Sequence, residues 1–288
     1  PLFETQVKKA GIETLAQLDQ LIRFSHYEDI QKLLHLCYRA DVYISVGHVA
    51  AARQFSFPQP VPASDNLLDV RELYHPQLSK PVTNSIALNE EQNLLFLTGA
   101  NMAGKSTFMK SLGICMYLAH MGFPVPAASM RFSVREGMLT TINLADNLSM
   151  GFSHFYSEVV RVKKIAAALQ KGLKLFVLID ELFRGTNVKD AHDATIAVAE
   201  GFVRKSQSLY VISTHIMEAG EILQKRCPRI SFHFLPTRME GNAPIYTRKL
   251  ESGISADRHG MIIIQNEGIL QMLDDCIAQE SFSKTVLV

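Results

Sequence analysis

The residues with the clearest chemistry lie in one short segment, GANMAGKS, at residues 99–106. This segment matches the pattern G-x-x-x-x-G-K-[ST], and it stands between an apolar run and a helix-period stretch. A polyphosphate is held by several backbone N–H groups at a helix N-terminus, and glycines leave room for its close approach. The segment therefore predicts a loop that binds the phosphates of a nucleotide. The alternative is an ordinary glycine-rich turn with a surface lysine.

Each position of this loop has an expected role. Lys105 would reach the β- and γ-phosphates, and the Ser106 hydroxyl would bind the Mg²⁺ ion that bridges them. Gly99 and Gly104 would keep the backbone open to the phosphates. The residues expected to surround the nucleotide are Gly99, Ala100, Asn101, Met102, Ala103, Gly104, Lys105, Ser106 and Thr107.

Two adjacent carboxylates follow a second apolar run, LFVLIDE, at residues 175–181. Five apolar residues predict a buried central strand, and ligands of open α/β folds bind at the carboxyl ends of such strands. We expect Asp180 to hold the Mg²⁺ shell. We expect Glu181 to accept a proton from, or to orient, the water that attacks the γ-phosphate. The alternative is a plain strand followed by solvated acids.

Two further polar positions have an expected role at the phosphates. A third apolar run, residues 208–213, is followed by Thr214 and His215, and this histidine would hydrogen-bond the γ-phosphate or the attacking water. Ser153 begins a helix-period stretch, where free N–H groups would bind the γ-phosphate of a nucleotide held by another subunit. A structural histidine and an ordinary serine helix cap are the alternatives.

The pattern around these residues predicts alternating strands and helices, and hence an α/β fold. Strands are expected at residues 93–98, 174–179 and 208–213, and helices at residues 105–121, 157–169 and 193–204. Later β-like runs, at residues 230–235, 244–250 and 261–267, favour a mixed, mostly parallel sheet flanked by helices. Residues 2–54 carry helix-period apolar positions, which predict a short N-terminal helical piece.

Composition predicts one large globular domain with a smaller part. The chain has 288 residues, of which 47% are hydrophobic and 20% charged, so it can bury a large core. The segment at residues 57–66 is rich in proline, serine and asparagine, which predicts a boundary near residue 58. We expect a helical segment at residues 1–58 and the α/β domain at residues 59–288. The net charge of +1 gives no preference for nucleic acid.

The sequence predicts a soluble, cytoplasmic protein without a membrane partner. Its apolar runs are much shorter than the ~18 residues that span a bilayer, and its first residues lack the apolar centre of a signal peptide. The four cysteines show no CxxC spacing, so we expect free thiols and no transition-metal site. The proline at position 1 suggests a chain cut from a longer protein.

Several segments together resemble the successive motifs of the MutS family of DNA mismatch-repair ATPases. They are TGANMAGKSTFMKSLG, GFPVPAASMRF, LADNLSMGFSHFYSEV, LIDELFRGTN and STH, in the family's order and spacing. The resemblance covers residues 75–268, and residues 41–52 are similar to the last core helix before the family's ATPase domain. It implies a P-loop NTPase fold of the ABC-ATPase type.

The resemblance also implies partners and further site residues. Family members form composite dimers, so Ser153 of each subunit of a homodimer would complete the partner's nucleotide site, and residues 184–187 would lie along the contact. The full-length protein would bind DNA and couple this binding to ATP turnover. The family's adenine contacts correspond here to Val82 and Asn84.

The sequence departs from the mismatch-binding members of the family. Those members carry a Phe-x-Glu wedge in an N-terminal domain, and no Phe-x-Glu triplet occurs here. HPQLSKPVTNSIAL and FYSEVVRVKKIA look closer to the divergent MutS-like branch, which leaves recombination control or another DNA task open beside mismatch repair. Two further hypotheses stay open: a P-loop ATPase of the ABC or SMC-like kind in transport or chromosome organisation, and a binding module whose site has lost turnover and uses ATP only as a switch.

Overall fold

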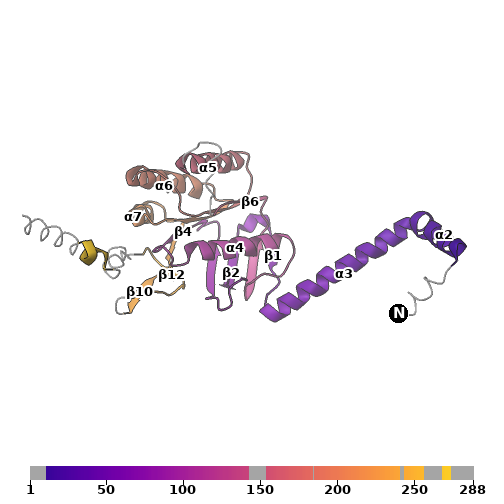
Figure 1. Cartoon of the computed structure of the whole chain (residues 1–288). Helices are drawn as coiled ribbons and strands as arrows, with labels where there is room; N and C mark the ends of the chain where they lie inside the picture. Colours follow the sequence, from indigo (N-terminus) through magenta and orange to yellow (C-terminus); the bar gives the residue numbers. More distant parts are fainter. Residues whose placement is uncertain (1–10, 143–153, 184, 241–242, 256–267, 274–288) are drawn as a thin grey trace, which may run out of the picture. The chain divides into compact units, whose positions relative to one another are not determined.

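The computed structural model describes residues 11–142, 154–183, 185–240, 243–255 and 268–273 (Figure 1). The chain divides into two compact units, residues 1–53 and residues 54–288. The first unit contains α2 (Ile12–Gln20), the π-helical turn η1 (Leu21–Ser25) and the long helix α3 (Tyr27–Arg53). Helices were expected here, but the apolar positions of α3 are mostly exposed, and Ala50 is its one buried residue.

The second unit alternates strands and helices. Its strands are β1 (Gln59–Val61), β2 (Leu68–Leu73), β3 (Asn84–Leu88), β4 (Leu94–Thr98), β5 (Ser129–Ser133), β6 (Gly137–Thr141), β7 (Leu175–Ile179), β8 (Leu209–Ser213), β9 (Ile230–Phe234), β10 (Thr237–Glu240), β11 (Ala243–Tyr246) and β12 (Glu251–Ser252). Its helices are α4 (Lys105–His120), α5 (His154–Gln170), α6 (Val188–Val203) and α7 (Met217–Arg226), with a 3-10 turn η2 (Ala63–Asp65).

A six-stranded sheet forms the centre of this unit, in the order β12-β9-β4-β8-β7-β6. All its neighbours are parallel except β12, which runs antiparallel to β9. Every residue of β4, β7 and β8 is buried, as expected for parallel strands covered on both faces. The structure thus confirms an α/β fold with a mixed, mostly parallel sheet.

The sheet separates two hydrophobic cores, because successive side chains of a strand point to opposite faces. Leu95 and Leu97 of β4 pack with α4 and with a second sheet of order β1-β5-β2-β3. Leu94 and Phe96 pack with residues of α5, α6 and α7 on the other face. Figure 1 shows the resulting layers, with α4 between the two sheets and the three later helices on the far side.

The structure differs from the sequence expectations at several boundaries. α6 begins five positions before residue 193, because the Asn187 side chain caps it by accepting the N–H of Asp190 at 2.9 Å. The strand expected at residues 244–250 ends at Tyr246, before Arg248, whose φ of 56° is incompatible with a strand. The strand expected at residues 261–267 lies outside the described residues.

Cysteine, metal and membrane features can be stated for the described part of the chain. Cys37, Cys115 and Cys227 are free thiols. The described residues contain no cluster of three or more histidine, cysteine or acidic side chains that would hold a metal ion. None of the described helices combines the length and the apolar character needed to cross a membrane.

Candidate functional site

The loop between β4 and α4 is shaped by positive φ angles. Gly99 has a φ of 141°, Met102 of 68° and Gly104 of 110°. A Cβ atom at Gly99 would lie 3.0 Å from the carbonyl oxygen of Leu235, so a side chain there would be both strained and crowded. Gly104 is the N-cap of α4, and the loop therefore leads to the N–H groups of a helix first turn.

The Lys105 side chain folds back over this loop. Its Nζ donates hydrogen bonds to the carbonyl oxygens of Gly99, at 2.8 Å, and Ala100, at 3.2 Å. Burial lowers the pKa of the Lys105 ammonium, while attraction to Glu181 and Asp180 acts in the opposite direction. Both acceptors are neutral carbonyls, so an anionic phosphate would form stronger bonds with this ammonium.

The remaining loop residues differ in exposure. Ala103 is buried in the core, and its N–H is donated to the carbonyl oxygen of Ala100 at 3.3 Å. Ser106 is half-buried, whereas Asn101, Met102 and Thr107 are exposed. Ala103 therefore anchors the loop, and the exposed residues present it to solvent.

The two acidic residues stand at the carboxyl end of β7. The Asp180 N–H donates to the carbonyl oxygen of Thr141 at 3.2 Å, and the Ser213 hydroxyl donates to Asp180 Oδ1. The Glu181 N–H donates to Ser213 Oγ at 3.0 Å, and Glu181 has a φ of 53°. Because β4, β8 and β7 run parallel in one sheet, the acid pair after β7 and the loop after β4 that carries Lys105 open on the same sheet edge, and both carboxylates attract the lysine ammonium.

The polar residues after β8 reach the same sheet edge, because β4, β8 and β7 are parallel neighbours. The Thr214 N–H donates to the carbonyl oxygen of Leu97 at 3.1 Å, and Thr214 Oγ1 accepts the N–H of Ile216 at 3.0 Å. His215 follows and is exposed. Ser153 lies outside the described residues, so its expected role at a partner's site stays a prediction.

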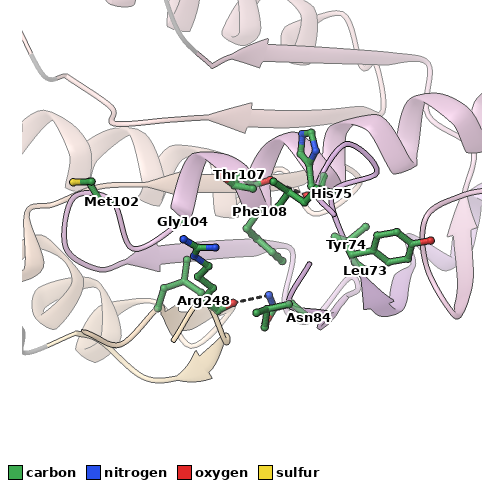
Figure 2. Close-up of a pocket in the computed structure, with 13 residues that line it drawn as sticks. Leu73, Tyr74, His75, Asn84, Met102, Gly104, Thr107, Phe108 and Arg248 are labelled. Atoms are coloured by element: carbon green, nitrogen blue, oxygen red, sulfur yellow. Dashed lines mark hydrogen bonds between the residues drawn. The ribbon is translucent and has the colours of Figure 1, made fainter. Parts of the chain in front are cut away.

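A pocket of about 220 Å³ adjoins the loop on the side of the second sheet (Figure 2). Apolar side chains, among them Val82, Phe108 and Leu235, form part of its wall. His75 and Arg248 contribute polar groups, and Gly104 connects the pocket to the loop. The pocket therefore has room, next to the loop, for a small group that contacts both apolar and polar side chains.

Asn84 lines this pocket, but its side-chain amide is hydrogen-bonded to the backbone of residues 248 and 250. Its Nδ2 donates to the carbonyl oxygen of Arg248 at 3.0 Å, as Figure 2 shows, and its Oδ1 accepts the N–H of Leu250 at 2.7 Å. Asn84 thus fixes the segment that carries Arg248. Sequence reasoning missed Arg248, because it lies inside a run that resembles a strand and no motif marks it.

Comparisons with known proteins match the region that contains this site. The family model described as MutS domain V matches residues 95–279. A DNA mismatch repair protein MutS from Flavobacterium johnsoniae is 28% identical over 280 residues, which cover 94% of this chain and 32% of the relative. Another protein of that name, from Phocaeicola vulgatus, is 30% identical over 241 residues, covering 80% and 27%.

A relative with a different name has a similar degree of identity. MutS protein homolog 4 from Homo sapiens is 28% identical over 247 residues, which cover 82% of this chain and 26% of the relative. The chain therefore spans between about a quarter and a third of the length of these three relatives.

Proposed function

Because the chain belongs to the MutS family, we propose that residues 59–288 form a P-loop ATPase domain of the ABC type. The observation that carries the proposal is the convergence of Lys105 with Asp180 and Glu181 at one edge of a parallel sheet. A lysine on a glycine loop and two carboxylates at the end of another parallel strand, β7, which β8 separates from β4, are the groups that phosphoryl transfer requires. The family match also disfavours a transporter subunit or an SMC-like protein.

In this proposal the loop holds the phosphates of ATP or ADP. Lys105 exchanges its bonds to Gly99 and Ala100 for bonds to the β- and γ-phosphates, and residues 99–107 surround them. Ser106 and Asp180 offer a hydroxyl and a carboxylate, oxygen donors that suit Mg²⁺, which takes few protein ligands and retains water and phosphate oxygens. A bound magnesium ion would supply positive charge to the two phosphates.

Glu181 and His215 act on the hydrolytic step. Glu181 accepts a proton from the attacking water while the water oxygen bonds to the γ-phosphorus and the bond to the bridging oxygen of ADP breaks. His215 hydrogen-bonds the γ-phosphate from the end of β8, and its exposure leaves the imidazole accessible to the nucleotide. The products are ADP and inorganic phosphate.

The adjoining pocket receives the adenine base. Val82, Phe108 and Leu235 offer apolar contacts to the flat faces of the ring, and the Arg248 guanidinium can stack on it. Asn84 contributes indirectly, because its amide holds the backbone of the segment that carries Arg248. A pocket next to the phosphate-binding loop favours a nucleotide as the ligand over a simple phosphate ion.

The whole protein acts as a homodimer on DNA in this proposal. Ser153 would complete the nucleotide site of the partner subunit, and ATP turnover would be coupled to DNA binding. Two relatives carry the name DNA mismatch repair protein, which supports mismatch repair as the cellular process. The chain spans at most about a third of those relatives, so DNA recognition is assigned to the full-length protein.

ATP turnover measured against protein concentration tests the proposal. A composite site predicts that turnover per subunit rises with concentration, since assembly follows mass action. Lys105→Ala is the control and should abolish ATP binding and turnover together. Duplex, mismatched and branched DNA are added in turn, and the DNA that stimulates turnover identifies the preferred structure.

Two results would contradict the proposal. Absence of ATP binding by the chain would reject the nucleotide site as a whole. Binding of ATP without turnover at any concentration, with or without DNA, would instead favour a module that uses ATP as a switch.

A further inference from the structure

Ser213, the last residue of β8, connects both acidic residues of the site. It is fully buried, and its hydroxyl donates to Asp180 Oδ1 while accepting the backbone N–H of Glu181 at 3.0 Å. Its carbonyl oxygen also accepts the N–H of Leu182 at 3.4 Å. One side chain on β8 thus contacts the side chain of one acid and the backbone of the other.

The direction of these hydrogen bonds is fixed by chemistry. A carboxylate accepts only and an amide N–H donates only, so the single hydroxyl proton must point to Asp180 and a lone pair to Glu181. The rotation of the hydroxyl is therefore set by both neighbours at once. In turn, the hydroxyl fixes one oxygen of the Asp180 carboxylate.

The link lies where the β-ladder ends. The last paired residues of β7 and β8 are Ile179 and Ile212, and the chain then leaves the extended conformation. Glu181 has a φ of 53°, a left-handed conformation that is unfavourable for a residue with a side chain. The Ser213 hydroxyl provides the acceptor that this N–H no longer finds in the ladder.

We propose that Ser213 is a positioning residue for ATP hydrolysis, acting through Asp180 on the metal and through Glu181 on the water. This inference rests on the function proposed above. Ser213 touches neither nucleotide nor reacting atoms in this assignment. Its removal would therefore weaken the use of Mg²⁺ and the catalytic step more than the binding of ATP itself.

A matched pair of variants at the two ends of β8 tests the inference. Ser213→Ala removes the link to the acid pair. Ser208→Ala removes a similar buried hydroxyl next to the start of β8, where Ser208 Oγ accepts the Leu175 N–H at 2.9 Å. Both variants break a side-chain link between the same two strand regions, so their structural costs should be comparable.

The readouts separate positioning from stability. For Ser213→Ala we expect kcat to fall about 3- to 10-fold, because the two hydrogen bonds that position Asp180 and the Glu181 backbone are lost. The Mg²⁺ concentration for half-maximal turnover should rise. ATP affinity measured without Mg²⁺ should be unchanged. Ser208→Ala should leave kcat and the Mg²⁺ requirement unchanged. Ser213→Thr, which keeps the hydroxyl, should restore most of the turnover.

Each outcome decides the matter. Equal kcat and Mg²⁺ requirement in the Ser213→Ala and Ser208→Ala variants would overturn the positioning role. If Ser213→Ala does not fold, Ser213→Cys, with a poorer hydrogen-bonding group of similar size, takes its place. If the unaltered chain binds ATP without turnover, only the ATPase assignment fails. The increase in ATP affinity that Mg²⁺ produces, compared between the unaltered chain and Ser213→Ala, then tests the role of Ser213.

Discussion

The ammonium nitrogen of Lys105 lies 2.8 Å from the carbonyl oxygen of Gly99, so the lysine closes the loop on its own first residue. Lys105 is only 5% exposed, and its ammonium is held against two neutral carbonyl oxygens while the carboxylates of Asp180 and Glu181 attract it. A phosphate would therefore meet a cation that is already desolvated and held within the loop. Such preorganisation lowers the cost of binding an anion.

The lowered pKa of Lys105 gives ATP binding a pH dependence. Only the ammonium form attracts phosphate, and burial moves its pKa below the ordinary 10.5 of lysine in the free protein. ATP affinity should therefore be constant near neutral pH and fall at alkaline pH, earlier than for an exposed lysine. Isothermal titration with ATP at a series of pH values from neutrality upward measures this.

Lys105→Arg is the matched control for this titration. A guanidinium stays charged through the alkaline range, so the variant should bind ATP more weakly but with a flatter pH profile. The same alkaline slope in both proteins would show that Lys105 does not control the titration.

Glu181→Gln should separate ATP binding from hydrolysis. The amide keeps the size of the side chain but cannot take a proton from water, so turnover should fall by about 10²- to 10⁴-fold. ATP affinity should change little, because Lys105 and the loop are untouched. Single-turnover measurement of phosphate release gives the rate, and Glu221→Gln, at an exposed position of α7, should behave as the unaltered protein. Normal turnover in the Glu181 variant would reject the assignment.

Asn84→Ala should loosen the wall of the nucleotide pocket. The variant loses the bonds from Nδ2 to the Arg248 carbonyl and from the Leu250 N–H to Oδ1, which costs stability by about 1–3 kcal/mol. The segment that carries Arg248 would then be less ordered, and KM for ATP should rise. Thermal unfolding and steady-state kinetics measure the two effects.

Asn84→Asp provides the comparison for this loss. The aspartate keeps an oxygen acceptor for the Leu250 N–H but has no donor for the Arg248 carbonyl. A KM equal to that of the unaltered protein in both variants would show that the segment holds its position without Asn84.

The central sheet could be predicted from sequence because its strands carry continuous apolar runs. β4, β7 and β8 are buried on both faces, so each reads as five apolar or small residues bounded by the polar groups of the site. The second sheet could not be predicted in the same way. β2 reads LDVREL, with charged residues inside the strand, and its register shifts between Val70 and Leu73, where Glu72 has a φ of 52°.

The residues of the site also differ in how far the sequence predicts them. The loop and the acid pair follow local patterns, so the sequence predicts them, although their catalytic roles remain predictions. Asn84 and Arg248 are 164 residues apart, and their contact depends on how the two sheets and the intervening chain pack. Ser213 is the first residue of the STH segment, but the sequence did not identify it as a link, because a serine at a strand end has no characteristic spacing to the acids that it contacts.

Two helical glycines give a pair of stability predictions that differ through packing alone. Gly201 in α6 is exposed, and a Cβ there meets no atom within 4 Å, so Gly201→Ala should raise the free energy of unfolding by about 0.5–1 kcal/mol. Gly113 in α4 faces β7, where a Cβ would lie 3.1 Å from Leu178 Cδ1. In Gly113→Ala, overpacking against Leu178 should cancel the gain in the free energy of unfolding, so this substitution should be neutral or destabilising.

Urea denaturation followed by circular dichroism compares the two variants under identical conditions. The close approach of Gly113 to Leu178 matters for the site, because it sets how α4 packs on β7. Lys105 lies in the first turn of α4, and the acid pair directly follows β7. Gly113→Ala should accordingly also weaken ATP binding, whereas Gly201→Ala should not. An equal gain in stability from both substitutions would mean that α4 can move away from Leu178 at no cost, and the packing of α4 on β7 would then not fix the position of Lys105.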